Sequence, residues 1–281
     1  MTISPRKMSR SLAVLAVAIG GIGIVAPSVA SAVDGGRDGA APVTAKVPTY
    51  DEFYKSTYRD ADGQWIVDGD MPISSGAALK AFYGNVFSKT QSQRLIVNQV
   101  NGRDDVWSAR QARNLTYCVS DKFGSDKQTV IDAMEGGGQI WSDATSAIRF
   151  VYVPAQDKSC NTRNTKVVFS VEPVSYASYI ARSFFPSSPK SQRNILINMN
   201  QFGSSSWPVN NILAHEMGHI LGLRHEHTRP EAGTCFEDNN WRPLTPYDSS
   251  SIMHYPQCNG TSSDLSFTET DGEGIRTLYG E

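Results

Sequence analysis

The sequence lacks a surplus of either charge. Its 281 residues include 26 Lys and Arg against 28 Asp and Glu, which gives a formal net charge of -2 with neutral histidines. Nucleic acids and anionic membrane surfaces favour a clear basic excess, so the composition argues against nucleic acid as a partner. With 40% hydrophobic and 19% charged residues, the chain has the composition of an ordinary soluble globular protein.

The sequence also lacks an apolar run suited to a membrane-spanning helix. Its apolar stretch at residues 11–25 is short and broken by glycines. It follows a basic stretch that ends at Arg10 and leads to Ala-Ser-Ala at 30–32, a pattern typical of signal-peptide cleavage. We therefore expect residues 1–32 to be a secretory signal peptide, and the protein to be secreted, extracellular and without stable membrane association. No adjacent arginine pair precedes the run, which favours the general export route.

Cysteine is scarce, and no two cysteines form the C-x-x-C spacing of common metal sites. In an exported protein an even number of cysteines favours disulfides. The four residues Cys118, Cys160, Cys235 and Cys258 permit three pairings. We favour Cys118 with Cys160 and Cys235 with Cys258, because each pair lies within one local unit.

The chain changes character near residue 110, and no internal repeat is present. Residues 33–110 begin with a Gly-, Ala- and Pro-rich lead-in, are polar and contain no cysteine, so they are expected to form little core. Residues 111–281 alternate strand and helix patterns, which predicts an α+β domain. The expected strands lie at 113–120, 147–153, 166–173 and 193–199, and the expected helices at 126–145 and 207–223.

Four of the five histidines lie within the thirteen residues HEMGHILGLRHEH at 215–227. On a helix, His215 and His219 lie on one face a turn apart. Gly222 stands where a helix commonly ends in a left-handed conformation, so the chain can turn and bring His225 to the same point. Three neutral imidazoles with an open position are the ligand set of a catalytic Zn²⁺, and we expect one such ion.

Glu216 lies beside this expected site and can take a proton from a zinc-bound water and return it to a leaving amine. A structural zinc site is the main alternative, but such sites usually close with a fourth protein ligand, often Cys. A chance cluster of surface histidines is the other alternative. The pattern favours hydrolysis of peptide bonds, with protein or peptide substrates.

The stretch HEMGHILGLRHEHTR resembles the long zinc signature of the metzincin metalloproteases, and its ending resembles the astacin branch and related bacterial secreted peptidases. SIMHY at 251–255 resembles their methionine turn. The resemblance implies a two-lobed fold with a mixed twisted sheet, an active-site helix and a C-terminal helix. It also implies Met253 beneath the zinc, Tyr255 as a switchable ligand and oxyanion stabiliser, and Glu226 as the partner of a new amino terminus.

The fragment VDGDM at 67–71 resembles the propeptide motif with which astacins place an aspartate on the zinc. The resemblance implies that Asp70 keeps the precursor latent and that residues 33–110 are a propeptide. An ordinary turn is the alternative reading of Asp-Gly-Asp. The lack of cysteine before Cys118 excludes the thiol-based latency of another metzincin branch.

These observations predict a secreted zinc endopeptidase, made as a latent precursor, with residues 111–281 as its catalytic domain. We expect a monomer that binds peptides along an edge strand at 193–199 or in the segment before it. Two alternatives remain open at this stage: an extracellular zinc-binding protein without catalysis, and a metal-dependent amidase that acts on cell-wall peptide.

Overall fold

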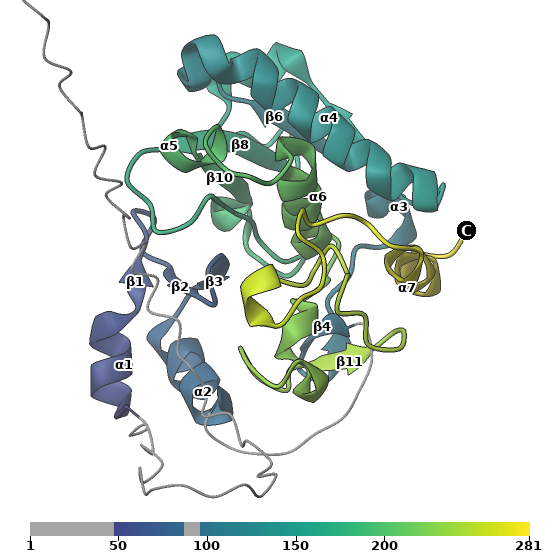
Figure 1. Cartoon of the computed structure of the whole chain (residues 1–281). Helices are drawn as coiled ribbons and strands as arrows, with labels where there is room; N and C mark the ends of the chain where they lie inside the picture. The colour runs from purple at the N-terminus through teal and green to yellow at the C-terminus, as the bar shows by residue number, and fades with distance from the viewer. Residues whose placement is uncertain (1–47, 87–95) are drawn as a thin grey trace, which may run out of the picture.

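The computed structural model describes residues 48–86 and 96–281 (Figure 1). The expected signal peptide at 1–32 lies outside the described residues. In chain order the elements are α1 Tyr50–Ser56, β1 Tyr58–Arg59, β2 Trp65–Val67, β3 Met71–Ile73, α2 Gly76–Val86, β4 Ile96–Val100, β5 Arg103–Asp104, α3 Ala109–Ala112, β6 Leu115–Val119, α4 Lys127–Ala144, β7 Phe150–Tyr152, β8 Phe169–Val174, β9 Ala181–Arg182, β10 Asn194–Asn198, α5 Met199–Phe202, α6 Val209–Ile220, β11 Trp241–Pro243 and α7 Glu269–Tyr279.

The central sheet has five strands in the order β7-β6-β8-β10-β9. Neighbouring strands are parallel except for β9, which runs antiparallel to β10 and forms an edge. The mixed sheet and its helices confirm the predicted α+β fold. Of the two segments predicted to offer an edge to substrate, β9 lies at an edge of the sheet and β10 does not.

Helix α6 packs against α4 across a buried interface (Figure 1). The approach is close at Gly137, where a Cβ atom would lie 2.9 Å from the backbone nitrogen of Ala214. Trp141 is fully buried and donates its indole N–H to the Ala214 carbonyl at 2.8 Å. The apolar stripe predicted on α6 faces this core, and its members are all buried: Ile212, Leu213, Met217, Ile220 and Leu221. These contacts hold the helix that carries the first two histidines.

Residues 48–86 form a small unit beside the main body (Figure 1). Its three strands make the antiparallel sheet β1-β2-β3, and it has its own apolar cluster, which comprises Phe53, Trp65, Val67, Met71, Leu79 and Phe82. Ile66 on the other side of β2 packs against Tyr179 and Leu196 of the main body. Asp60 accepts hydrogen bonds from Tyr179 and from the buried Arg182 of β9, both at 2.7 Å. This unit therefore lies against the edge of the central sheet.

Residues 96–107 belong structurally to the main body. Strand β4 pairs with both β5 and β11 in a second small sheet, and Val97 forms a bridge with Leu223. Trp107 is buried in the main core and donates its indole N–H to the carbonyl of Ile220 at 2.7 Å. Of the segment predicted as a propeptide at 33–110, the described residues 48–86 form the small unit, whereas those from 96 onward pack with the main body.

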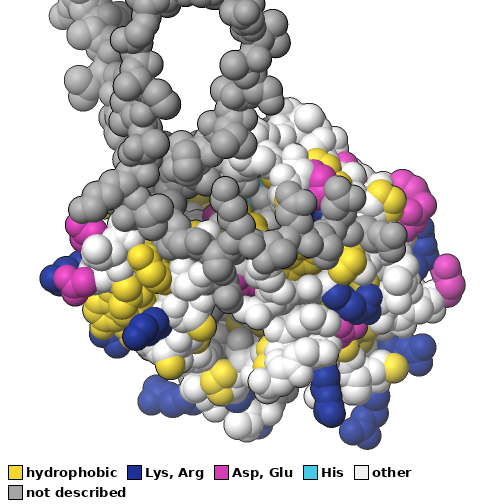
Figure 2. Space-filling view, turned by 90° about the horizontal axis from the view of Figure 1, so that it is seen from below, with side chains coloured by type: hydrophobic (Ala, Val, Ile, Leu, Met, Phe, Trp, Pro, Cys, Tyr) yellow, Lys and Arg dark blue, Asp and Glu magenta, His cyan; other side chains and the backbone are white. Residues whose placement is uncertain are grey.

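Among the residues that the structure describes, no helix is both long and apolar enough to cross a membrane. On the face seen in Figure 2, acidic and basic side chains are dispersed among uncharged ones. The histidines are hidden because all five are buried, with at most 2% of each residue exposed.

Candidate metal centre and active site

Three histidines meet at the end of α6. Helical spacing places His215 and His219 on one face, and Gly222 adopts φ +93°, the left-handed conformation expected of it. A Cβ atom at Gly222 would lie 2.2 Å from the Asp105 carbonyl oxygen, so the turn also needs glycine for space. The turn returns His225 to the helix, where its Nε2 lies 3.2 Å from Nε2 of His215.

In His215 and His219 the outer ring nitrogen, Nδ1, faces away from the cluster, and its hydrogen bond determines which nitrogen carries the proton. Nδ1 of His215 lies 2.7 Å from the Ile252 carbonyl, and Nδ1 of His219 lies 2.8 Å from the Leu223 carbonyl. A carbonyl only accepts hydrogen bonds, so each neutral ring carries its proton on Nδ1. The Nε2 lone pairs therefore point toward a common centre, as metal-binding imidazoles require.

The donor set fits a zinc ion. Ligands at tetrahedral angles and about 2.0–2.1 Å from zinc lie roughly 3.4 Å apart. Asp70 Oδ2 lies 3.3 Å from His215 Nε2, and Asp70 Oδ1 lies 3.2 Å and 3.7 Å from Nε2 of His225 and His219. Among the described residues, neither His219 Nε2 nor Asp70 Oδ1 has a hydrogen-bond partner, although both are buried. The lone pairs of these atoms converge with no hydrogen-bond donor among them, and a bound cation would stabilise this arrangement. These residues could therefore hold Zn²⁺.

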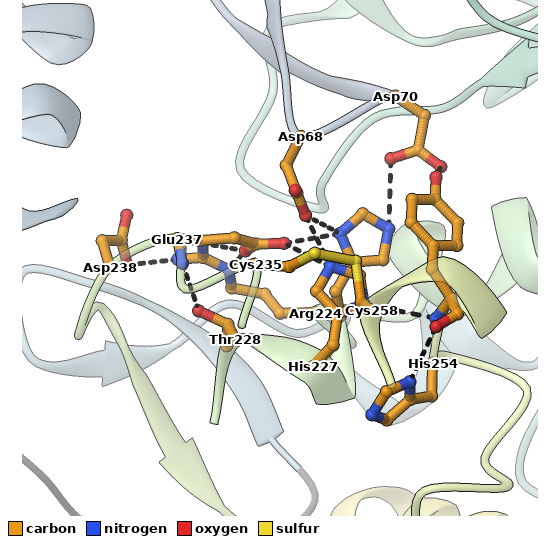
Figure 3. Close-up of polar contacts among 12 residues, drawn as sticks. Asp68, Asp70, Arg224, His227, Thr228, Cys235, Glu237, Asp238, His254 and Cys258 are labelled. Carbon is orange, nitrogen blue, oxygen red and sulfur yellow. Dashed lines mark hydrogen bonds and ion pairs between the residues drawn. A yellow bond between two sulfur atoms is a disulfide. The ribbon is translucent and has the colours of Figure 1, made fainter. Parts of the chain in front are cut away.

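Asp70 of the small unit and Tyr255 of the methionine turn complete the polar cluster, and Figure 3 shows the carboxylate of Asp70 there. The Tyr255 hydroxyl donates a hydrogen bond to Asp70 Oδ2. Burial and the negative charge of Asp70 raise the pKa of Tyr255 well above its usual value, so the phenol keeps the proton that it donates. Asp70 thus occupies the side of the histidine cluster that the protein otherwise leaves open.

Glu216 is buried directly beside the histidines. Burial raises the pKa of its carboxyl well above the usual range, and the nearby Asp70 carboxylate raises it further. Its Oε2 has no hydrogen-bond partner among the described residues. A bound cation would lower this pKa, which leaves a carboxylate that can accept and release a proton.

The methionine turn passes beneath α6. A Cβ atom at Gly218 would lie 2.4 Å from Met253 Sδ, so the sulfur packs directly against the helix between the first two histidines. Asp271 of α7 holds the turn by accepting hydrogen bonds from the Ser251 hydroxyl at 2.5 Å and the Ile252 N–H at 2.9 Å. The expected C-terminal helix therefore supports the site as well as the core, in which Ile275 is fully buried.

Both disulfides form in the pairing favoured from the sequence, Cys118 with Cys160 and Cys235 with Cys258. The second connects the loop after the zinc motif to the segment after Tyr255 (Figure 3).

Glu226 is fully buried, and Arg229 donates to its Oε1 at 2.6 Å. Its second oxygen, Oε2, has no partner among the residues described. A buried carboxylate oxygen with no donor is compatible with a further cationic partner, which is the role that the resemblance implies for Glu226.

Two carboxylates at the site were not predicted from the sequence. Glu237 Oε1 lies 2.5 Å from Nδ1 of His225, and Asp68 Oδ2 lies 2.6 Å from Nε2 of His227. Asp68 stands two positions before Asp70, and this spacing was the available signal for it. Nothing in the sequence marks Glu237, which lies twelve positions after His225 in a loop.

Three converging histidines with an adjacent glutamate and a methionine packed under the helix are the arrangement that the resemblance to metzincins implies. No protein-family model matches the chain. Tolloid-like protein 1 from Homo sapiens is 30% identical over 137 residues, which represent 41% of this chain and 12% of that protein. Bone morphogenetic protein 1 from Xenopus laevis is 28% identical over 137 residues, 41% of this chain and 18% of that protein. These sequence relatives confirm the predicted resemblance to astacin-like metzincins, although the chain spans less than a fifth of their length.

Two solved structures are also similar. Myroilysin has a TM-score of 0.48 at 18% identity, with 66% of this chain and 98% of that chain covered. High choriolytic enzyme 1 from Oryzias latipes, a hatching enzyme zinc-protease, has a TM-score of 0.41 at 18% identity, with 62% of this chain and 94% of that chain covered.

Proposed function

We propose that this chain is a secreted zinc-dependent endopeptidase made as a latent precursor. The observation that carries the proposal is the convergence of His215, His219 and His225 on one point, with Glu216 beside it and Asp70 on the remaining side. A structural zinc site would need neither a buried unpaired Glu216 nor a ligand from a separate unit of the chain.

A bound zinc ion polarises the scissile carbonyl and makes a water molecule more acidic. Glu216 takes the proton of that water and passes it to the leaving amine, which its buried and unpartnered Oε2 favours. Tyr255, once freed from Asp70, donates its hydroxyl hydrogen to the oxyanion that develops on the carbonyl. His215, His219 and His225 would hold the metal through Nε2.

Latency follows from the position of Asp70. Its carboxylate faces all three histidines and holds the Tyr255 hydroxyl, so water and substrate are both excluded while residues 48–86 stay docked. We propose that the inhibitory unit ends before Ile96, since β4 and Trp107 pack within the main body. Glu226 is then the candidate partner of a newly formed amino terminus.

The substrate is proposed to lie along β9, whose outer edge carries no strand among the described residues. An extended peptide would add to the sheet there through main-chain hydrogen bonds, which depend little on side-chain identity. Asp60 holds Arg182 of β9 in the full chain, so the same unit that blocks the metal also blocks this edge. The loop at 228–258 is the candidate wall of the pocket next to the scissile bond.

Cleavage of denatured casein tests the proposal. The full chain, activated by limited proteolysis, is compared with Glu216→Ala and with Glu273→Ala, which changes an exposed glutamate of α7. We expect about one zinc in each protein, and a loss of about 10²–10⁴-fold in hydrolysis for Glu216→Ala alone. Zinc in all three with cleavage in none would favour the non-catalytic binding protein. Cleavage of cell-wall peptide but not of casein would favour the amidase.

A further inference from the structure

The third histidine of the metal centre differs from the first two in what its outer nitrogen contacts. His215 and His219 donate to main-chain carbonyls, whereas Nδ1 of His225 lies 2.5 Å from the Glu237 carboxylate. A carboxylate is a stronger acceptor than a carbonyl because the hydrogen bond is charge-assisted. His225 is also the only one of the three that lies outside α6, so the helix does not fix its ring.

Glu237 is held rigidly on its far side. Its Oε2 accepts from Arg224 Nε at 3.1 Å and also from Nη2, and its main-chain N–H donates to the Thr228 hydroxyl oxygen at 2.9 Å. Arg224 also pairs with Asp238 at 2.5 Å. Glu237 and Arg224 are 1% and 3% exposed, so the contacts are shielded from water. Figure 3 shows Glu237 with Arg224, Thr228 and Asp238 around it.

The disulfide joins this network to the other side of the site. Cys235 lies two residues before Glu237, and Cys258 lies three residues after Tyr255. The bond therefore fixes the loop of the carboxylate relative to the segment that carries the tyrosine (Figure 3).

The small unit at 48–86 also contacts Nδ1 of His225, through Asp68. Asp68 Oδ2 lies 3.0 Å from Nδ1 of His225 and 2.6 Å from Nε2 of His227. His227 Nδ1 accepts the Tyr255 main-chain N–H at 3.2 Å, so its Nε2 carries the proton and donates to Asp68. Asp68 and Asp70 thus lie on opposite sides of the His225 ring, one at the outer nitrogen and one at the metal-facing nitrogen.

A second metal ion is a weaker explanation of this cluster. Asp68, His225, His227 and Glu237 place four potential ligand atoms within 4.8 Å of one another. However, those atoms already form donor and acceptor pairs, and the guanidinium of Arg224 lies directly on Glu237. A positive charge beside the cluster disfavours another cation.

We infer that Glu237 is the positioning residue of the metal centre and that Asp68 shares its hydrogen bond in the latent chain. Glu237 orients the His225 ring, keeps its proton on Nδ1 and makes Nε2 a better donor to zinc. Asp68 takes part of the same hydrogen bond while the small unit is docked, and departs with it. The inference rests on the proposed zinc centre and extends it to the control of the third ligand.

Zinc affinity of the full chain tests the inference, measured by competition with a chromophoric chelator. Glu237→Gln is compared with wild type in two backgrounds, with Asp68 intact and with Asp68→Asn. We expect zinc to bind about 10–100-fold more weakly in Glu237→Gln with Asp68→Asn, and a smaller loss where Asp68 remains. Asp238→Asn is the matched control, because it contacts the same arginine without touching His225.

Thermal unfolding of the metal-free proteins separates positioning from misfolding. Glu237→Gln and Asp238→Asn each weaken a buried ion pair with Arg224, so we expect both to unfold at a similarly lowered temperature, and only Glu237→Gln to lose zinc affinity. Unchanged zinc affinity in the double variant would overturn the inference, as would an equal loss in Asp238→Asn. A second bound zinc that disappears with Glu237→Gln would also overturn it, in favour of a two-metal site. These readouts do not depend on hydrolysis, so a failure of casein cleavage would refute the peptidase proposal and leave this result standing.

Discussion

Asp70 and Tyr255 are 185 positions apart in the sequence, yet the tyrosine hydroxyl donates a hydrogen bond to the aspartate directly beside the three histidines. This hydrogen bond engages both the carboxylate and the hydroxyl. In the proposed latent precursor, the aspartate fills the open side of the metal centre and holds the tyrosine away from a substrate carbonyl. Four of the predictions below concern how the small unit at 48–86 maintains or depends on this arrangement.

Replacing Asp70 with asparagine should make the unprocessed chain active. The amide keeps the shape but loses the negative charge that faces the histidines, and a hydrogen bond to a charged group contributes about 1.5–3 kcal/mol. We expect casein cleavage by the uncleaved precursor to rise about 10- to 100-fold. An unprocessed Asp70→Asn protein that stays as inactive as wild type would show that the small unit blocks the cleft by other contacts.

Asp68→Asn should have a weaker effect on latency. Its carboxylate contacts only the outer side of His225 and His227, so Asp70 still faces the metal. We expect precursor activity between that of wild type and that of Asp70→Asn in the same casein assay. Greater activity than Asp70→Asn would mean that Asp68 contributes more to the blockade than the aspartate nearest the Nε2 atoms.

Gly69→Ala should release latency without removing either aspartate. Gly69 adopts φ +92°, and an added Cβ atom would lie 3.2 Å from the Tyr255 ring. The strain of a left-handed alanine is about 1–2 kcal/mol, and both effects push the motif away from the site. Gly84→Ala is the control, because nothing lies within 4 Å of its added Cβ atom in α2. We expect increased precursor activity from Gly69→Ala alone.

A chain that begins at residue 96 should be more stable than one that begins at residue 111. The longer form retains β4, which pairs with β11, and Trp107, whose loss from a core costs about 3–5 kcal/mol. Thermal unfolding of the two zinc-loaded proteins measures the difference, and casein cleavage shows whether each forms a site. Equal melting temperatures would place the boundary near 110, where the sequence predicted it.

Asp60→Ala should loosen the small unit from the main body. Asp60 pairs with Arg182, which is fully buried, and truncation leaves that charge with fewer partners. We expect the full chain to lose about 3 kcal/mol of unfolding free energy, the lower end for a broken buried pair, since Asp62 still contacts Arg182. Asp51→Ala, which breaks an exposed pair with Lys55, should change the urea midpoint little. Equal midpoints for the two variants would contradict this prediction.

Local spacing made much of the site predictable. The i, i+4 histidines need only helical geometry, and Gly222 needs only the stereochemistry of a helix end. The apolar stripe on α6 could be predicted for the same reason, because buried positions repeat with the helical period. The cysteine pairs were favoured on local grounds, and the structure has both.

The features that could not be predicted from the sequence depend on contacts between segments that lie far apart in the chain. Nothing local distinguishes Glu237 from a surface glutamate, because its role comes from the fold of the loop that brings it to His225. The division of residues 33–110 was also hidden. The sequence of a five-residue strand such as β4 does not show which strand it pairs with. Its partner, β11, lies more than 140 positions away in the chain.

The sequence by itself determined the class of this protein, since the zinc motif, its glutamate and the methionine turn are local patterns whose chemistry follows from residue type and spacing. Tertiary structure alone decided which carboxylate faces which nitrogen, with Asp70 on the metal side and Asp68 and Glu237 on the outer side of His225. Spacing along one element is set by backbone geometry. Contacts between elements depend on packing across the whole core, and no short stretch of sequence determines that packing.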